Sequence, residues 1–223
     1  MQDRKNALIT RFGKTIQWLG QSAVRLNHKN MVIYIDPYQI QDDIPANIIL
    51  ITHSHFDHFS IEDITKISRA DTLFLAPEDC VSRLQDTGYE QILTVAPNQI
   101  HAITGIKIDT VPMYNVVKQN KHPREMNWVG YVLTLNDVRL YHAGDTERIP
   151  EMKNIRCDIA LVPLGQTYTM NSVNEATEAV LDVQARIAIP IHYGQYEGTE
   201  ADAQEFKELL AGKVDVLILN PVP

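Results

Sequence analysis

Short apolar runs rich in β-branched residues recur along the chain and predict strands. They cover residues 15–19, 23–26, 31–35, 47–52, 91–95, 106–111, 129–135, 138–141, 159–162, 186–191 and 214–219. Asn136 and Asp137 fit a tight turn between two of these strands. The run at 47–52 is continuously apolar, which is typical of a strand buried on both faces.

Helix-start signals appear where the strand pattern stops. Helices are predicted to begin at Ser60, with Asp63 three residues later, at Pro77–Glu78, at Ser172 and at Thr199. Gly88 and Gly212 are placed to end two of them. Strands dominate the first half, and strands alternate with helices in the second half, so an α/β fold is predicted.

Composition limits the classes of protein that fit. The 223 residues, 44% of them hydrophobic, suit a single domain over residues 1–223. A net charge of −8 and the absence of a Lys/Arg run argue against a nucleic-acid partner. The sequence has no apolar run long enough to span a bilayer and no export signal at its start, so we predict a cytoplasmic protein of unknown oligomeric state.

The strongest chemical signal follows the run at 47–52. His53, His55, Asp57 and His58 fall within six residues, and imidazole and carboxylate are ligands that zinc and related ions prefer. Side chains alternate along an extended chain, so His53 and His55 can point to the same side. Packing alone does not explain such a cluster, and a metal site is predicted.

Two further candidates follow later strands. Asp145 lies in the segment Tyr141-His-Ala-Gly-Asp-Thr146, where Gly144 allows a tight turn. His192 ends the apolar run Ile189-Pro-Ile-His192, where ligands of layered α/β folds gather. Each alone could be structural, but beside the first cluster Asp145 becomes a carboxylate able to bridge two ions.

These motifs, in this order, resemble the metallo-β-lactamase superfamily over Trp18 to about Gly194. The similar segments are Trp18-Leu-Gly20, Tyr34-Ile-Asp-Pro37, the cluster at 53–58, His142-Ala-Gly-Asp-Thr146 and Ile191-His-Tyr-Gly194. They look like the subgroup that contains L-ascorbate 6-phosphate lactonase and N-acyl-phosphatidylethanolamine-hydrolysing phospholipase D. The resemblance implies a four-layer αββα sandwich, with one ion held by histidines like His53 and His55, a second held by residues like Asp57, His58 and His192, and Asp145 between them.

The chain departs from that pattern at two places. Gln21 stands where family members often carry histidine after Trp-Leu-Gly. Met113-Tyr-Asn115 occupies the segment where many members place a third histidine for the first ion. His122 is the nearest histidine, and the sequence leaves open whether it is a metal ligand, a substrate-binding group or a plain loop residue.

Other residues could bind a substrate. Lys118, Lys121 and Arg124 lie on the same long loop, which is either a solvated segment or an anion-binding lid. Tyr168 could donate a hydrogen bond to an oxyanion, although packing explains it equally well. The substrate-binding candidates are therefore His122, Lys118 and Tyr168.

The residues predict a hydrolase that uses a metal-activated hydroxide at a dinuclear site, with Asp57 orienting the hydroxide and accepting its proton. Two divalent cations are expected, zinc first, with manganese or iron as alternatives. The substrate is predicted to be a small ester, lactone or phosphodiester. Two other readings stay open, a metal-binding protein without turnover and a nuclease acting on nucleic acid.

Overall fold

The computed structural model describes residues 15–222, which divide into two compact units. The first unit runs to Thr94 and includes the chain end from Leu219, and the second unit spans Val95–Ile218. The start of the chain, on which the prediction about an export signal rests, lies outside the described residues. The single domain predicted over 1–223 stays a prediction.

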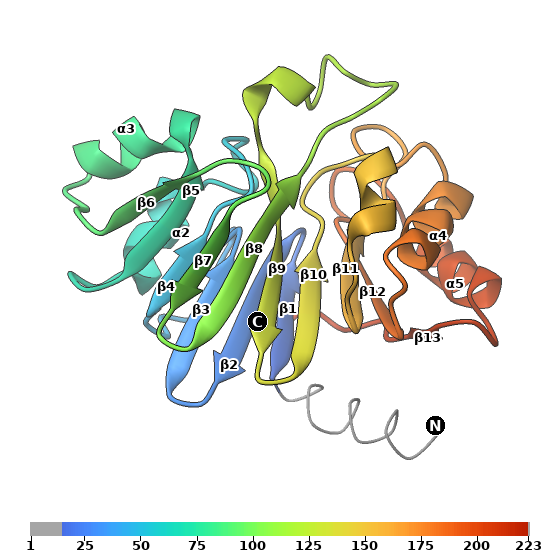
Figure 1. Ribbon diagram of the computed structural model, residues 1–223, viewed down its shortest axis with the longest axis horizontal. Coiled ribbons are helices and arrows are strands. Elements are labelled where there is room, and N and C mark those ends of the chain that lie inside the picture. Colours follow the sequence, from blue (N-terminus) through green and yellow to red (C-terminus); the bar gives the residue numbers. More distant parts are fainter. Residues whose placement is uncertain (1–14, 223) are drawn as a thin grey trace. The chain divides into compact units, whose positions relative to one another are not determined.

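The first unit is built on a mixed sheet whose strands lie side by side in sequence order (Figure 1). The strands are β1 (Ile16–Gly20), β2 (Ala23–His28), β3 (Met31–Ile35), β4 (Ile48–Leu50), β5 (Leu73–Pro77) and β6 (Ile92–Val95). β1, β2 and β3 are antiparallel, and β3, β4 and β5 are parallel. Parallel neighbours need a crossover connection, which α2 (Ile61–Ile67) provides between β4 and β5.

Helix α2 begins where the sequence predicts. The Ser60 side chain accepts a hydrogen bond from the Asp63 N–H, which satisfies one of the free donors at the start of a helix. The buried Asp63 carboxylate in turn accepts the N–H groups of Gln39 and Ile40, each at 2.9 Å. Asp63 therefore fixes the segment that follows β3, and this segment begins with Asp36.

Apolar side chains join the first sheet to α2 and α3 (Glu78–Asp86). Ile49 and Ile51, Ile64 of α2, Cys80 of α3 and Phe74 of β5 are all fully buried in one cluster. Burial of this kind stabilises a fold by about 25 cal/mol for each Å² of apolar surface removed from water. The cluster holds the end of β4 rigidly, directly before the histidine-rich segment.

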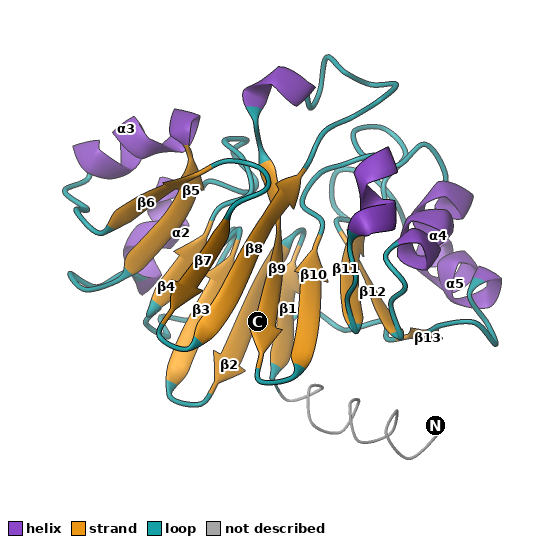
Figure 2. Cartoon of the chain, in the orientation of Figure 1, coloured by secondary structure: helices purple, strands orange, loops and turns teal. Residues whose placement is uncertain are grey.

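The second unit also contains a mixed sheet (Figure 2). In spatial order its strands are β13 (Asp215–Val216), β12 (Ile187–Ile191), β11 (Ile159–Pro163), β10 (Val138–His142), β9 (Val129–Leu135), β8 (Ile106–Pro112) and β7 (Ile100–Ile103). Strands β7 to β10 are antiparallel, whereas β10 to β13 are parallel. The helical elements are η1 (Arg124–Met126), η2 (Pro150–Asn154), α4 (Val173–Asp182) and α5 (Glu200–Leu209).

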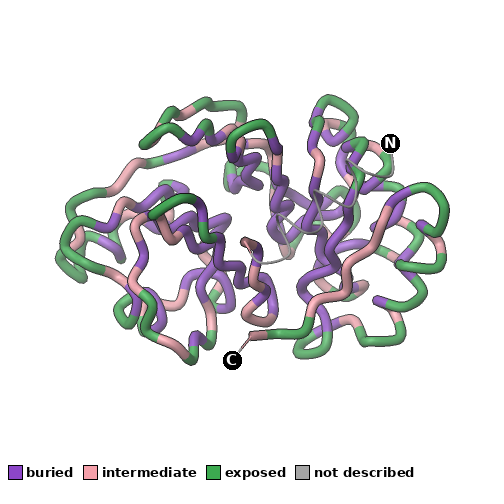
Figure 3. The backbone as a smooth tube through the Cα atoms, turned by 90° about the horizontal axis from the view of Figure 1, so that it is seen from below, coloured by how far each residue is buried: buried purple, intermediate pink, exposed green. Residues whose placement is uncertain are grey.

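Burial explains the strand patterns of the second unit. Every residue of β11 and β12 is buried, as expected for parallel strands with both faces covered. Figure 3 colours the buried residues of the described chain purple. Both strands end at loops that carry polar side chains, and His192 directly follows β12. The sheet therefore presents these side chains from the carboxyl ends of neighbouring strands.

The structure confirms most predicted elements and corrects a few. The helices begin at the predicted caps, and Thr199 and Asp202 form a reciprocal capping box at α5. Strands β5 and β7 were not predicted. β5 runs directly into a helix-start signal at Pro77, and β7 lies at the edge of its sheet, where its residues are exposed or half-buried. The last strand is shorter than the predicted 214–219 and keeps only Asp215–Val216.

Within residues 15–222, none of the helices combines the length and the apolar character that a membrane crossing requires.

Candidate functional site

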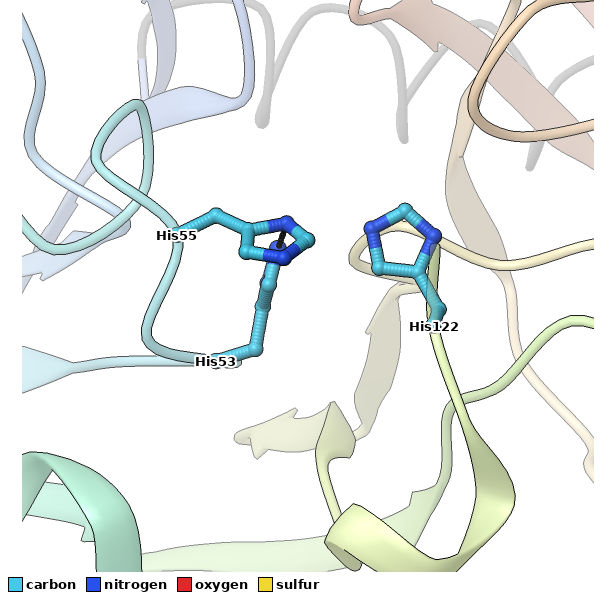
Figure 4. A group of neighbouring side chains, drawn as sticks. All are labelled: His53, His55 and His122. Carbon is cyan, nitrogen blue, oxygen red and sulfur yellow. Dashed lines mark hydrogen bonds between the residues drawn. The ribbon is translucent and has the colours of Figure 1, made fainter. Parts of the chain in front are cut away.

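In the first unit, the predicted ligands occupy the loop between β4 and α2. His53 and His58 are fully buried, and the Asp57 side chain is nearly so. His53 Nε2 lies 3.0 Å from His55 Nδ1, a contact drawn as a dashed line in Figure 4. The two histidines therefore present one ring nitrogen each to the same point, as the alternation of side chains predicts.

Asp36 orients both buried histidines. One of its carboxylate oxygens, Oδ2, lies 2.7 Å from His58 Nδ1 and accepts the Thr52 hydroxyl at 2.6 Å. Since that hydroxyl gives its hydrogen to Asp36, its 2.9 Å contact with His53 Nδ1 requires the imidazole to donate. Both histidines then offer Nε2 as the nitrogen that can bind a metal ion. Asp36, His53 and His58 are themselves close enough to form a possible metal-ligand group.

Gln21 holds the carboxylate of Asp57. Its side-chain Nε2 donates to Asp57 Oδ2 at 2.9 Å, and Gln21 is itself buried, with a φ of 47°. The same Asp57 oxygen is 3.6 Å from His58 Nε2. The residue that replaces the family's frequent histidine therefore orients the Asp57 carboxylate, a role that the sequence did not reveal.

In the second unit, three buried side chains converge from separate loops. Asp145 follows β10, His192 follows β12, and His122 (labelled in Figure 4) lies between β8 and η1. Asp145 Oδ2 is 3.0 Å from His192 Nε2 and 3.5 Å from His122 Nε2. His122, which the sequence left undecided, thus lies beside the same carboxylate oxygen as His192.

Glu197 orients His192 as Asp36 orients His58. Its Oε1 is 2.9 Å from His192 Nδ1 and accepts the Thr169 hydroxyl, and its Oε2 accepts the N–H groups of Thr167 and Tyr168. Burial would raise the pKa of the Glu197 carboxyl, but the hydrogen bond and charge of His192 outweigh burial, so this pKa lies below its ordinary value. Because Nδ1 is engaged, Nε2 is the His192 atom available to a metal ion.

Two glycines let Glu197 reach that position. A Cβ added at Gly165 would lie 1.7 Å from Glu197 Cδ, far inside contact distance. Gly198 has a φ of +62°, and a Cβ there would meet the Leu164 carbonyl oxygen at 2.4 Å. Sequence reasoning missed Glu197 because it lies in a loop with no ligand-like spacing to His192.

A second buried carboxylate, Glu147, organises the long loop after β8. It accepts the N–H groups of Val116, Val117 and Lys118 at 2.7, 2.6 and 3.0 Å. The Lys118 ammonium lies 3.1 Å from Glu147 and donates to Asn171 at 2.6 Å. Lys118 therefore has a structural role in this loop, and its predicted contact with a substrate stays a prediction.

Tyr168 takes part in the site mainly through its backbone. Its N–H donates to Glu197, and its carbonyl oxygen accepts from the Asn115 side chain. The Lys121 ammonium lies 5.0 Å from the centre of the Tyr168 ring, which is a cation–π distance. The hydrogen bond that Tyr168 is predicted to donate to an oxyanion stays a prediction.

The donors of each unit fit a divalent ion such as zinc. Two nitrogen or oxygen ligands of a tetrahedral zinc ion, each bound at about 2.0–2.1 Å, lie about 3.3 Å apart. The measured separations are 3.0 Å for His53 and His55, 3.6 Å for Asp57 and His58, 3.0 Å for Asp145 and His192, and 3.5 Å for Asp145 and His122. Pairs of side chains within each unit therefore already have the spacing of ligands to one ion.

Comparison with known proteins first defines the superfamily. Residues 15–192 match the family model described as the beta-lactamase superfamily domain. The chain is 32% identical over 221 residues to a UPF0173 metal-dependent hydrolase of Thermococcus onnurineus, covering 92% of this chain and 96% of that protein. Among solved structures, a proposed metal-dependent hydrolase from Parabacteroides distasonis is similar, with a TM-score of 0.80, 33% identity and 93% of each chain covered.

A more distant structure has the same fold. Igni18, a metallo hydrolase of Ignicoccus hospitalis, gives a TM-score of 0.79 at 22% identity and covers 93% of this chain and 95% of its own. The present chain belongs to the metallo-β-lactamase superfamily and, within it, to the UPF0173 metal-dependent hydrolases. The predicted fold and the predicted class of enzyme, a metal-dependent hydrolase, are thereby confirmed.

Proposed function

We propose that the enzyme uses His53, His55, Asp57, His58, Asp145 and His192 to bind two divalent ions, and that it hydrolyses a small ester, lactone or phosphodiester. The observation that carries this proposal is the position of Asp145 Oδ2, 3.0 Å from one histidine and 3.5 Å from another. A carboxylate oxygen between two imidazoles is suited to two ions, because its negative charge balances both of them. Membership of a metal-dependent hydrolase family supports the same conclusion.

The donors sort into two sets by their chemistry. His53, His55 and His122 supply three neutral nitrogens, and Asp57, His58 and His192 supply one carboxylate and two nitrogens. Asp145 completes both sets as the bridge. In this arrangement His122 takes the place of the third histidine that the family often carries after the strand corresponding to β8.

Each residue then has a defined task in hydrolysis. Bound divalent ions lower the pKa of water toward neutrality and polarise the substrate oxygen. Asp57 accepts the proton of the attacking water, while the hydrogen bond from Gln21 keeps its carboxylate in one orientation. Asp36 and Glu197 keep His58 and His192 in the tautomer whose Nε2 carries the lone pair that can bind a metal ion.

The proposed substrate class, metal and location rest on the sequence motifs and composition described above. The resemblance to the lactonase and phospholipase D subgroup favours lactones and phosphodiesters. Zinc is the first choice of metal because nitrogen donors predominate, and manganese and iron are the alternatives. A cytoplasmic location and a small-molecule substrate without nucleic acid complete the proposal.

Hydrolysis assays of metal-stripped and reconstituted protein test this proposal. The stripped protein is loaded with zinc, manganese or iron and offered a nitrophenyl ester, a lactone and bis(p-nitrophenyl) phosphate. Metal-dependent turnover of at least one substrate is expected. The variant Asp57→Asn should lose that turnover, and Asp43→Asn, which changes an exposed carboxylate of the same unit, should keep it. Two bound ions with no turnover in any assay would show a metal-binding protein instead.

A further inference from the structure

Asn115 is buried in the segment where many family members place a third histidine, and its side chain and backbone N–H are engaged inside the second unit. Its backbone N–H donates to the His122 carbonyl oxygen at 2.8 Å. Its side-chain Nδ2 donates to the Tyr168 carbonyl oxygen at 2.7 Å, and its Oδ1 accepts the Glu147 N–H at 3.0 Å. One residue therefore joins its own loop, which carries His122, to the loops that follow β10 and β11.

Each of these contacts leads to one proposed ligand. His122 is bonded directly, and Glu147 lies two residues after Asp145 in the same loop. The path to His192 is longer, because the Tyr168 N–H donates to Glu197, which contacts His192 Nδ1. All three metal-binding side chains of the second unit are thus linked through Asn115.

The chemistry of the side chain explains why asparagine suits this position. A planar amide carries a donor and an acceptor on neighbouring atoms, so it can bond a carbonyl on one side and an N–H on the other. Aspartate has no hydrogen to give to Tyr168, and it would bring a negative charge close to the Glu147 carboxylate. A histidine ring does not reproduce the two adjacent contacts.

Glu147 holds the same loop from its other side. Its carboxylate accepts three consecutive N–H groups directly after Asn115, while its own N–H donates to Asn115. The loop is thus attached to the Asp145 segment in both directions. A buried hydrogen-bond network of this kind is rigid when every member is satisfied.

We propose that Asn115 is a positioning residue that sets the mutual placement of His122, Asp145 and His192. Asn115 is not itself a metal ligand in this proposal, and replacing it with histidine weakens metal binding rather than restoring a third donor. The inference rests on the proposed metal-binding function, since its consequence is metal affinity. It also predicts coupled loop mobility, which can be measured without any metal.

Calorimetric titration of the stripped protein with zinc alone tests the first consequence. Residues that orient ligands typically contribute about 10–100-fold to metal affinity, so Asn115→Asp should weaken zinc binding within that range. The matched control is Asn127→Asp, which makes the same chemical change at an exposed position of the same loop. Asn115→Ser, which keeps a smaller donor and acceptor, provides a milder second variant if Asn115→Asp does not fold.

Hydrogen exchange of the stripped proteins tests the second consequence. Asn115→Asp or Asn115→Ser should raise exchange together at residues 113–123, 145–149 and 165–170, with thermal unfolding monitored in parallel. Faster exchange confined to 113–123, or unchanged zinc affinity in a folded variant, would overturn the positioning role. A parent protein that binds no zinc would overturn the proposed function instead, and the exchange data would still decide the role of Asn115.

Discussion

The two units supply metal-type side chains in contrasting ways. In the first unit, His53, His55, Asp57 and His58 lie within six residues after one buried strand. In the second unit, the donors stand at positions 122, 145 and 192, on three loops joined by hydrogen bonds. The compact motif is positioned by the strand that precedes it, whereas the dispersed side chains depend on hydrogen bonds between their loops.

The carboxylates that orient histidines, Asp36 and Glu197, also differ between the two units. Asp36 acts on two histidines of one short segment, directly on His58 and through Thr52 on His53. Glu197 acts on His192 alone, and its remaining bonds hold the neighbouring loop. In the first unit, Asp36 therefore orients both buried histidines and Gln21 contacts Asp57. In the second unit, Glu197 contacts His192, and we propose that Asn115 and Glu147 position the remaining loops.

The largest loss of metal affinity should come from Asp145→Ala, which tests whether this residue of the second unit contributes to the binding of both proposed ions. Losing the proposed bridge removes the charge that balances both ions. Because outer partners of ligands already contribute about 10–100-fold, loss of the ligand should exceed that range in affinity and abolish turnover. Metal analysis after dialysis measures it, with Asp137→Ala in the hairpin turn as the control. If the Asp145→Ala variant retained all its metal, Asp145 would have only a structural role in the turn.

His122→Ala should affect one ion only. The proposed set of His53, His55 and His122 has no carboxylate of its own, whereas the other set contains Asp57, so we expect the first set to bind its ion more weakly. That set has no other donor from the long loop, so the stripped variant should bind this ion at least about tenfold less tightly. The tighter ion, assigned to Asp57, His58 and His192, should change little. Stepwise calorimetry resolves the two events. Two equally tight ions in the parent, unaffected by His122→Ala, would contradict the unequal sites.

Paired changes of the orienting carboxylates probe the contrast between the units directly. Asp36→Asn should weaken both ions by about 10-fold or more, because His53 and His58 belong to different sets. Glu197→Gln should weaken mainly the ion bound by His192. Glu200→Gln, an exposed change near the same loop, is the control for the second variant. If Asp36→Asn and Glu197→Gln weakened both ions equally, the two carboxylates would not differ in the number of ions that they affect.

The smallest effect is expected for Lys121→Gln. Its ammonium lies over the Tyr168 ring and is only partly buried, so its attraction for an anionic substrate is weakened by solvent. KM for a charged substrate should rise about two- to fivefold, and KM for a neutral analogue should stay constant. Steady-state kinetics on matched substrates measure both. Equal changes for the two substrates would indicate an ordinary solvated loop.

The sequence predicted the parts of the molecule that depend on local pattern. Ser60 and Thr199 cap helices as expected, and the cluster at 53–58 follows a buried strand. Asp36 was not predicted as an orienting group because Thr52 and His58 lie far from it along the chain, and Glu197 was not predicted because its spacing from His192 fits no ligand pattern. Gln21 and Asn115 were noted only as departures from a family pattern, and their hydrogen bonds depend on tertiary structure.

Position 165 should be highly sensitive to substitution, although the sequence gives no sign of this. The residue has none of the features by which variants are usually ranked, since it is not a ligand, a cap or a left-handed turn. Yet a single methyl group there would occupy the volume of the Glu197 carboxylate. A random mutational survey should therefore find position 165 as intolerant as the histidines themselves. At Gly88 a Cβ would meet no neighbouring atom, and only its φ of +87° would oppose a side chain.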